Sequence, residues 1–266
     1  MFPAVGVTKG DLLKYYQQVS KLILPHLRNR PMTLERLPAG LVGKNFPHFW
    51  QKNTPEYYPK WIARAKMPSE EDRDVEYVLV NDERSLLWLV NQGTVTFHPW
   101  FSTIADPDRP TFVLFDVDPH QSTFINAVKV AKELHEVLDE EKIESFVKTT
   151  GKTGLHVMTP WKKGDFASAR KWAEQIAERV IERIPKIATT QRRIEARGKR
   201  VYLDVQQNSK GKHGVPPYVV RATPEATVSM PLDWKELTAK LDPKKFTVKN
   251  FAARMLRRGQ PASELI

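Results

Sequence analysis

The chain has 266 residues, of which 41% are hydrophobic and 27% charged. This composition is ordinary for a soluble globular protein, and the length suffices for one large domain or two small ones. No apolar run reaches the roughly 18 residues of a membrane span, and the first residues lack the pattern of a secretory signal. The absence of cysteine excludes disulfides, thiolate metal sites and cysteine nucleophiles. We therefore expect a cytoplasmic protein with no membrane partner.

The charge is the first indication of function. Lysine and arginine number 42 against 31 acidic residues, which gives a net charge of +11. Such an excess favours polyanionic partners, because each neutralised phosphate releases condensed counterions. Basic residues cluster at 192–200 and 210–212, on either side of a short apolar segment. Many basic proteins bind no nucleic acid, so charge alone leaves this partner open.

The first half of the chain predicts an alternation of helices and strands. Apolar residues at helical spacing predict a helix over 9–27, and the Pro- and Gly-rich stretch that follows predicts strands and loops. Residues 76–82 and 95–100 have the composition of strands, and 85–93 predicts a short helix that Gly93 ends.

The second half predicts the same mixture more clearly. Expected strands lie at 111–119, 200–208 and 217–222, expected helices at 125–141, 166–184 and from 231 onward, and a hairpin at 143–150 and 154–161. This order indicates an α+β fold with mixed, largely antiparallel sheets flanked by helices. No linker is evident, so residues 1–266 are expected to form a single domain.

Asp116 and Asp118 end the apolar run FVLF and are the most informative pair in the sequence. Side chains two residues apart in a strand point to one face, so both carboxylates can share a site. Such neighbours raise each other's pKa unless a cation lies between them. Mg²⁺ or Mn²⁺, held by carboxylates and substrate phosphates, meets that need. The alternative is a solvated turn or a helix cap.

Asp204 adds a third carboxylate inside the apolar segment VYLDV. A carboxylate there is costly unless it is paired or coordinates a metal. Three carboxylates on neighbouring strands are typical of two-metal phosphoryl transfer. A simple ion pair with a nearby arginine is the other interpretation.

Two histidines, His98 and His156, also lie in strand-like runs. A lone histidine of this kind is more often a core residue, but two near a presumed metal site favour a functional role. His156 follows TTGKTG, whose hydroxyls, lysine and backbone amides could hold phosphate oxygens. This is not a Walker A motif, because Phe146 stands where that motif requires glycine.

Aromatic residues stand beside a lysine in the Pro-bounded stretch that contains Phe46, Phe49, Trp50 and Lys52. Exposed aromatics with a lysine suit base stacking and phosphate contact, whereas buried ones would belong to the core. Arg221 in YVVRA suits a phosphate, or alternatively an ion pair with Asp204.

Together these motifs resemble one family. The order FHPW, FDVDP, KTTGKTGLHV, VYLDVQQN and PPYVVRA is similar to the polymerase domain of bacterial ligase D, within the archaeo-eukaryotic primase superfamily. The likeness extends over nearly the whole chain, including TKGDLLKYY near its start and SMPLDWKEL near its end. It implies a primase-polymerase-like fold.

The resemblance also implies roles for individual residues. It assigns catalytic metal binding, with two divalent ions, to Asp116, Asp118 and Asp204. It assigns the incoming nucleotide to His98, Thr150, His156 and Arg221, and also to Lys52, which follows the aromatic pair Phe49 and Trp50 in the same motif. It assigns DNA contacts to Lys9, Phe49, Trp50 and Arg197, with Lys9 matching a lysine that recognises a downstream 5′-phosphate.

The sequence departs from the family pattern at a few positions. Thr150 stands where serine is common, and Trp50 where a second phenylalanine is usual; the hydroxyl and the stacking surface are both kept. A second phosphate-binding lysine that usually precedes Phe2 is not in the sequence, which puts 5′-phosphate recognition in question.

The function so implied is template-dependent nucleotidyl transfer, with primer extension and filling of short gaps by NTPs or dNTPs in non-homologous end joining. The implied partners are gapped or broken DNA, Mn²⁺ or Mg²⁺, a DNA ligase and an end-binding Ku-type protein at the nucleoid. The alternatives are a primase that starts chains de novo, a two-metal nuclease that uses the same carboxylates, and a DNA-binding module without catalysis.

Overall fold

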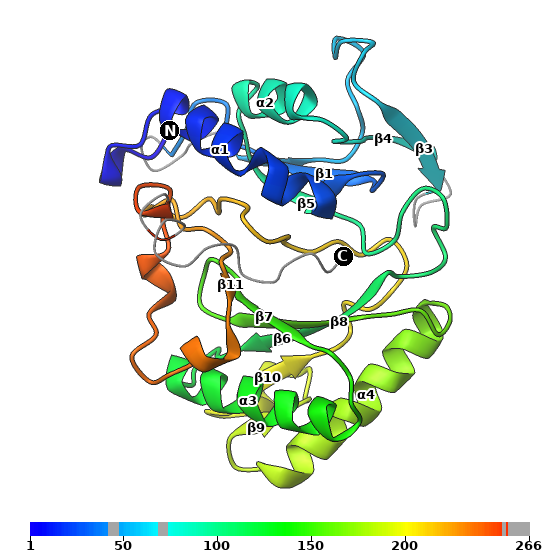
Figure 1. Cartoon of the computed structure of the whole chain (residues 1–266), viewed down its shortest axis with the longest axis vertical. Helices are drawn as coiled ribbons and strands as arrows, with labels where there is room; N and C mark the ends of the chain where they lie inside the picture. The colour runs from blue at the N-terminus through cyan, green and yellow to red at the C-terminus, as the bar shows by residue number, and fades with distance from the viewer. Residues whose placement is uncertain (42–47, 69–73, 252–253, 255–266) are drawn as a thin grey trace.

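The computed structural model describes residues 1–41, 48–68, 74–251 and 254. Helices α1 and α2 lie with one β-sheet at one end of the molecule, and α3 and α4 lie with a second sheet at the other end (Figure 1). Most strand pairs in both sheets are antiparallel, and β9 with β10 is parallel. The expected α+β fold with mixed, largely antiparallel sheets is confirmed. Within the described ranges no helix is long and apolar enough to cross a membrane.

The first part of the chain builds a five-stranded sheet in the order β2-β1-β4-β3, with β5 also paired to β1. Thr8 and Asp11 form a capping box that starts α1, which satisfies free amides of the first turn. Helix α2 packs against α1 and β5. The bounds are α1 Lys9–Leu27, β1 Met32–Arg36, β2 Phe49–Gln51, β3 Arg64–Pro68, β4 Asp74–Val78, α2 Glu83–Asn91 and β5 Thr94–Pro99.

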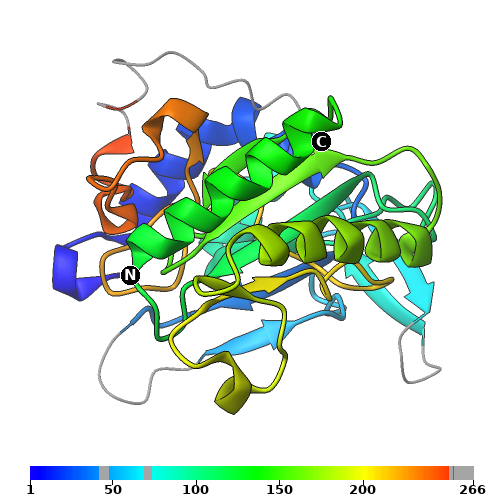
Figure 2. The same cartoon turned by 90° about the horizontal axis from the view of Figure 1, so that it is seen from below.

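The second part builds a six-stranded sheet in the order β11-β7-β8-β6-β10-β9. Helices α3 and α4 lie side by side across it (Figure 2). The bounds are β6 Phe112–Asp118, α3 Phe124–Glu140, β7 Phe146–Thr149, β8 Leu155–Pro160, α4 Phe166–Arg183, β9 Ala188–Thr189, α5 Ile194–Arg197, β10 Val201–Asp204 and β11 Pro231–Leu232, with 3₁₀ turns at Pro3–Val5, Trp234–Glu236 and Pro243–Lys245.

Strand β6 shows how the sequence directs its acids away from the helices. Val113, Phe115 and Val117 are fully buried in the main core, where Phe115 also contacts Trp172 of α4. Because side chains alternate along a strand, Asp116 and the residue two positions on emerge on the opposite face. The helices therefore anchor the strand, and the face turned towards the other sheet carries the polar residues.

Two sequence-based predictions in the last third of the chain are wrong. Residues 217–222 form no strand but an extended segment with one isolated bridge, between Val220 and Val228. Tyr218 has φ +65°, which interrupts a strand. Irregular backbone bonds to residues 227–229, such as Arg221 N to Thr227 O at 2.8 Å, take the place of a regular ladder. Side chains satisfy Val220: its N donates to Tyr16 Oη at 3.1 Å, and Thr96 Oγ1 donates to its O at 2.9 Å.

The helix predicted from 231 onward is also not formed. Pro231 and Leu232 pair with β7 as edge strand β11, and only a 3₁₀ turn follows. Trp234 Nε1 donates to Ser145 O at 3.0 Å, which holds the turn against the start of β7. Tertiary contacts with the sheet edge therefore override the helical spacing.

Candidate active site

Four side chains form one row across the six-stranded sheet. Lys148 of β7 lies directly opposite His156 of β8, which lies opposite Asp116 of β6, which lies opposite Asp204 of β10. Residues directly opposite in antiparallel strands point to the same face. The strand register therefore gathers a cation, an imidazole and two carboxylates in adjacent positions on one surface.

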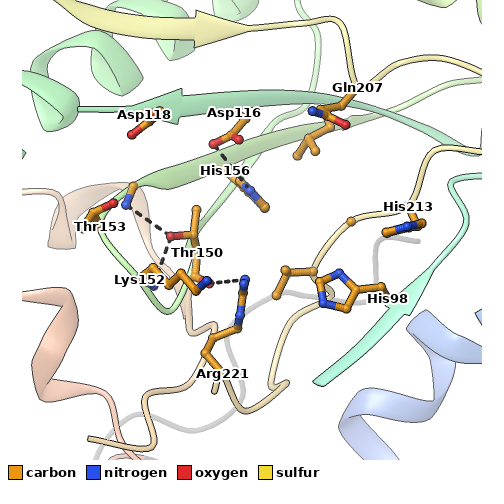
Figure 3. Close-up of a pocket in the computed structure, with 14 residues that line it drawn as sticks. His98, Asp116, Asp118, Thr150, Lys152, Thr153, His156, Gln207, His213 and Arg221 are labelled. Carbon is orange, nitrogen blue, oxygen red and sulfur yellow. Dashed lines mark hydrogen bonds and ion pairs between the residues drawn. The ribbon is translucent and has the colours of Figure 1, made fainter. Parts of the chain in front are cut away.

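This row borders a cavity of about 370 Å³. Figure 3 shows its side chains converging from the β6 and β8 strands, the turn after β7, the loop after β10 and the end of β5. The polar and charged lining residues are His98, Asp116, Asp118, Thr150, Lys152, Thr153, His156, Gln207, His213 and Arg221. The cavity thus unites six of the residues expected from the sequence to bind metal or nucleotide, while Asp204 lies beside it, opposite Asp116.

The three aspartates are close enough to affect each other. Burial, together with the charges of Asp204 and Asp118, raises the pKa of Asp116 to about 7. Asp118 accepts the amide of His120 at 3.0 Å, and Asp204 accepts the amide of Gln206 at 2.8 Å. The described ion pairs include none between Asp204 and an arginine, so the ion-pair interpretation of Asp204 lacks support.

The fit of this set to metal ions follows from its charge. Uncompensated carboxylates on one face repel, and a divalent cation between them would relieve that repulsion. No group of three or more acidic or histidine side chains within residues 1–41, 48–68, 74–251 and 254 already surrounds a single point as a metal site. An open carboxylate set that needs further oxygen ligands is what Mg²⁺ takes when it binds together with phosphates.

The turn between β7 and β8 is organised by Thr150. Its Oγ1 accepts the amides of Lys152 and Gly154, both at 3.2 Å. Gly154 is needed because a Cβ there would approach Val117 O to 2.6 Å. The hydroxyl oxygen is therefore engaged in the turn, and its hydrogen is what Thr150 can still offer to a bound nucleotide.

Arg221 lies over this turn, where its Nη1 donates to Thr150 O at 3.1 Å (Figure 3). Gly151 has φ +72°, and a Cβ there would meet Arg221 Cγ at 2.5 Å, so the arginine stem occupies the space of a missing side chain. Burial lowers the pKa of Arg221, and the charges of Glu35 and Asp116 oppose this. A buried guanidinium at the cavity wall suits a phosphate.

His156 and His98 lie on opposite walls of the cavity. His156 Nε2 lies 3.6 Å from Asp116 Oδ1, and Lys148 Nζ lies 2.8 Å from His156 Nδ1. His98 Nε2 lies 3.8 Å from Glu35 Oε2. Burial lowers the pKa of His98 to about 4 despite the nearby carboxylate, and burial with the charge of Lys148 lowers that of His156 well below its usual value. Both are neutral imidazoles at pH 7.

The aromatic pair of β2 is exposed, which contradicts the core interpretation. Phe49 is 40% exposed and Trp50 is 49% exposed. As strand neighbours they point to opposite faces. Trp50 contacts the cavity residues His98 and His213, with ring centroids 4.7 and 6.3 Å away, whereas Phe49 lies under Arg36 at 5.3 Å. Only Trp50 adjoins the cavity.

The other residues expected to bind DNA or nucleotide lie outside the cavity lining. Lys9 begins α1 and its Nζ donates to Asn91 O at 3.1 Å, and Lys52 is exposed just after β2. Arg197 lies over the Tyr202 ring at 3.6 Å and donates to two backbone carbonyls of its own loop. Phe46 is outside the described residues.

Four cavity or near-cavity residues were missed by sequence reasoning: Glu35, Lys148, Gln207 and His213. The signal for Lys148 was present, since a hairpin closed by GKTG places this lysine opposite His156. Gln207 follows Asp204 by three residues and donates to its carboxylate at 3.4 Å. His213 had no signal beyond its position in the basic segment, because a long loop brings it to the cavity.

Carboxylates on adjacent strands beside a cradle for phosphates define the class of nucleotidyl transfer enzymes that this site resembles. Residues 8–262 match the sequence profile of the family described as "LigD, primase-polymerase domain", and the chain belongs to that family. The chain is 35% identical over 257 residues to the bifunctional non-homologous end joining protein LigD of Bacillus subtilis. It is 27% identical over 241 residues to the multifunctional LigD protein of Mycolicibacterium smegmatis.

These matches cover 96% and 89% of this chain but only 41% and 31% of the two relatives, so the chain spans less than half of each. Among solved structures, the polymerase domain of Mycobacterium tuberculosis ligase D in complex with DNA is similar with a TM-score of 0.91 and 27% identity. That match covers 99% of this chain and 94% of the other. The expected family and the primase-polymerase-like fold are thereby confirmed.

Proposed function

We propose that this chain is a template-dependent nucleotidyltransferase that extends primers and fills short gaps in DNA during non-homologous end joining. The observation that carries the proposal is the row of Asp204, Asp116 and His156 beside the Thr150 turn and Arg221 around one cavity. Acidic groups and groups suited to phosphate therefore line the same cavity. Membership of the LigD primase-polymerase family supports the reaction class.

Asp116, Asp118 and Asp204 would hold two divalent ions, Mn²⁺ or Mg²⁺. Ions so placed would activate the attacking 3′-hydroxyl and stabilise the leaving pyrophosphate. The raised pKa of Asp116 supports this assignment, because a site that has to hold several carboxylates without a cation is under electrostatic repulsion.

The other polar residues of the cavity would hold the incoming nucleotide. Arg221 and Lys152 supply positive charge for the triphosphate, and neutral His156 supplies an N–H donor next to Asp116. His98 and Thr150, which line the same cavity, would contact its sugar. A cavity of about 370 Å³ with an open side suits a nucleotide whose base reaches out to a template.

DNA would approach over the aromatic and basic surface that adjoins the cavity. Trp50 offers an exposed ring for stacking, and the basic segment 192–200 with Arg197 offers contacts to phosphates. Lys52 and Lys9 would extend these contacts, Lys9 towards a downstream 5′-phosphate. The tuberculosis ligase D domain with which this chain shares its fold was solved in complex with DNA.

Residues 1–266 would act as one catalytic domain. The main hydrophobic cluster includes residues from both sheets, such as Phe97 of β5 and Val117 of β6, which favours a single folding unit. A DNA ligase and a Ku-type end-binding protein are the proposed partners at broken ends, given the end-joining names of the relatives.

The decisive experiment incubates the chain with a labelled template-primer, NTPs or dNTPs, and Mn²⁺ or Mg²⁺. Extension that follows the template sequence supports the proposal. Shortening of the primer would show a nuclease, products from an unprimed template would show a primase, and a mobility shift alone would show a DNA-binding module. A gapped substrate with and without a 5′-phosphate, compared in wild type and Lys9→Ala, tests recognition of the downstream strand.

A further inference from the structure

Lys148 is a buried lysine that the reaction as described so far does not use. It is 3% exposed and lies at the end of the row formed with His156, Asp116 and Asp204. It does not line the cavity and so cannot itself contact a nucleotide. Burying a lysine without purpose is costly, since both its charge and its donors must be satisfied. Its two side-chain contacts show what it does.

The hydrogen bonds around Lys148 have a defined direction. Ser229 Oγ donates its only hydrogen to Thr149 O at 2.8 Å, so at Lys148 it must accept. Lys148 Nζ donates to Ser229 Oγ at 2.9 Å and lies 2.8 Å from His156 Nδ1. The ammonium and the neutral amine both carry enough hydrogens to donate to the serine and to the histidine.

The contact of the other ring nitrogen, Nε2, favours the same assignment, with Nδ1 as the acceptor. His156 Nε2 faces Asp116 Oδ1 at 3.6 Å, and a lone pair on this nitrogen would point at a carboxylate oxygen. A hydrogen on Nε2 removes that conflict and leaves Nδ1 as the acceptor for Lys148. The two contacts therefore select one tautomer, with its N–H turned towards the acidic part of the cavity.

We infer that Lys148 is a positioning residue that holds His156 as the Nε2–H tautomer, so that the imidazole presents a fixed donor to the triphosphate and cannot bind a metal ion through Nε2. This inference rests on the proposed function only for the identity of the ligand. Ser229 contributes to this positioning, because its Oγ accepts a second hydrogen bond from Lys148 Nζ. In metal sites a histidine commonly donates its second N–H to a backing acceptor, which fixes its tautomer; here the backing group is a donor and fixes the tautomer in the same way.

Nuclear magnetic resonance tests the tautomer without any assay of activity. Long-range ¹H–¹⁵N correlation spectra of ¹⁵N-histidine-labelled, metal-free protein, recorded above the pKa of about 7 of Asp116 so that this carboxyl is ionised, report which ring nitrogen carries hydrogen, and a His156→Gln variant assigns the signal. Wild type should show hydrogen on Nε2 of His156. Lys148→Met, similar in length but without donors, should yield a mixture of tautomers. Hydrogen on Nδ1 in wild type, or an unchanged tautomer in Lys148→Met, would overturn the inference.

Lys152→Met is the matched control. It removes a lysine that lines the same cavity but has no contact with His156 in the described structure. It should weaken nucleotide binding through lost charge while the His156 tautomer stays unchanged. Ser229→Ala, a milder change behind the lysine, gives a second route if Lys148→Met does not fold, and it should produce a smaller shift towards the mixed state.

Kinetics then test whether the tautomer matters for the nucleotide. Lys148→Met should raise KM for the NTP roughly 10-fold with a smaller effect on kcat. In a His156→Ala background the same change should add little, because both act through one imidazole. Fully additive effects would show that Lys148 acts independently. If wild type has no polymerase activity, the proposed function fails, and the spectra still decide the tautomer.

Discussion

His156 and His98 stand on opposite walls of the cavity and are backed by opposite charges. Lys148 lies behind His156 in the six-stranded sheet, and Glu35 lies behind His98 in the five-stranded sheet. Burial keeps both imidazoles neutral, even though the carboxylate near His98 favours its charged form. The backing group therefore does not set the charge of either imidazole. At His156 we infer that it instead sets which ring nitrogen carries hydrogen.

The two walls of the cavity, one formed by the six-stranded sheet and the other by the five-stranded sheet, also differ in how well their strands are supported. The acids and His156 lie within β6, β8 and β10, whose register continues over several pairs and whose other face is covered by α3 and α4. Trp50 lies on the three-residue strand β2 at the edge of its sheet. A rigid wall suits catalytic geometry, and an exposed edge suits a surface that adapts to DNA. Substitutions of the acids or His156 should therefore affect the catalysed reaction, and substitutions in β2 should affect the binding of DNA or nucleotide.

Asp116→Asn should give the largest effect and should distinguish most clearly between the roles of the two walls. Loss of a metal-binding carboxylate should lower kcat more than about 1,000-fold, with DNA affinity nearly unchanged because the basic surface supplies it. The folded protein should become more stable without metal. Primer extension, a DNA-binding titration and urea unfolding in a chelator measure the three quantities.

The pH dependence of that stability gain follows from the sign of the shift. Burial and its acidic neighbours raise the pKa of Asp116 from about 3.8 to about 7, so ionisation of the wild type costs stability as pH rises through this window. Asparagine does not ionise, so the advantage of the variant should grow between about pH 4 and 7 and then level off. Asp118→Asn and Asp204→Asn are the companion variants. Near-normal turnover with Mn²⁺ in any of the three would refute the assigned triad.

Trp50→Ala should give the next largest effect, on binding and not on folding. The ring is half-exposed and adjoins the cavity, so its removal should cost about 1–3 kcal/mol of affinity for template-primer or nucleotide. Salt should weaken DNA binding steeply in both wild type and variant, since phosphate contacts remain.

Phe49→Ala is the matched control for this wall, because the neighbouring ring points to the opposite face and contacts Arg36. We expect it to weaken DNA binding with little effect on nucleotide KM. A collapsed melting temperature in Trp50→Ala would support a structural role for the ring. Equal nucleotide effects in both variants would show that strand alternation does not separate their functions.

Glu35→Gln should have a moderate effect that tests the backing of His98. Burial alone would raise the pKa of Glu35, but the neighbouring polar groups of His98 and Thr96 and the charge of Arg221 lower it to about 2. A lowered pKa means that the carboxylate stabilises the fold above about pH 4.5 and loses this contribution as pH falls towards 2. The variant should lose about 1.5–3 kcal/mol of unfolding free energy at pH 7, and the difference should shrink below pH 4.5. A pH-independent difference would contradict this account.

Much of the fold was predictable because its signals are local. The expected helix over 9–27 has the bounds that the structure shows, and the hairpin at 143–161 follows from its GKTG turn. The extended segment around Tyr218 was not predictable, because side chains of α1 and β5 far away in sequence satisfy its backbone. The helix expected from 231 failed for a related reason, since the edge of the sheet recruits those residues.

The site was predictable to the extent that it lies on strands. Asp116 and Asp118 could be placed on one face from alternation alone, and the structure brings both to the cavity together with His156. Glu35 and His213 reach the cavity through the packing of the other sheet and a long loop, and the sequence carries no spacing that relates them to the acids. Lys148 could have been found, since only the register of one hairpin was needed.

Substitution of Thr150 should give the smallest effect. It tests whether this residue contributes to the choice between NTPs and dNTPs. Its Oγ1 accepts two amides of the turn, so a ribose 2′-hydroxyl could receive only its remaining hydrogen. Thr150→Val removes both functions, whereas Thr150→Ser keeps both and removes only the methyl group.

We therefore expect wild type to prefer NTPs and Thr150→Val to narrow the ratio of kcat/KM for NTP over dNTP by about 2- to 10-fold, the effect of one hydrogen bond. The valine variant should also lose kcat/KM for both substrates, because the turn that supports Arg221 loosens. Thr150→Ser should match wild type in both respects. If valine lowers both rates and leaves the ratio unchanged, the hydroxyl serves the turn alone and the 2′-hydroxyl is held elsewhere. A wild-type preference for dNTPs would remove the basis for this contact altogether.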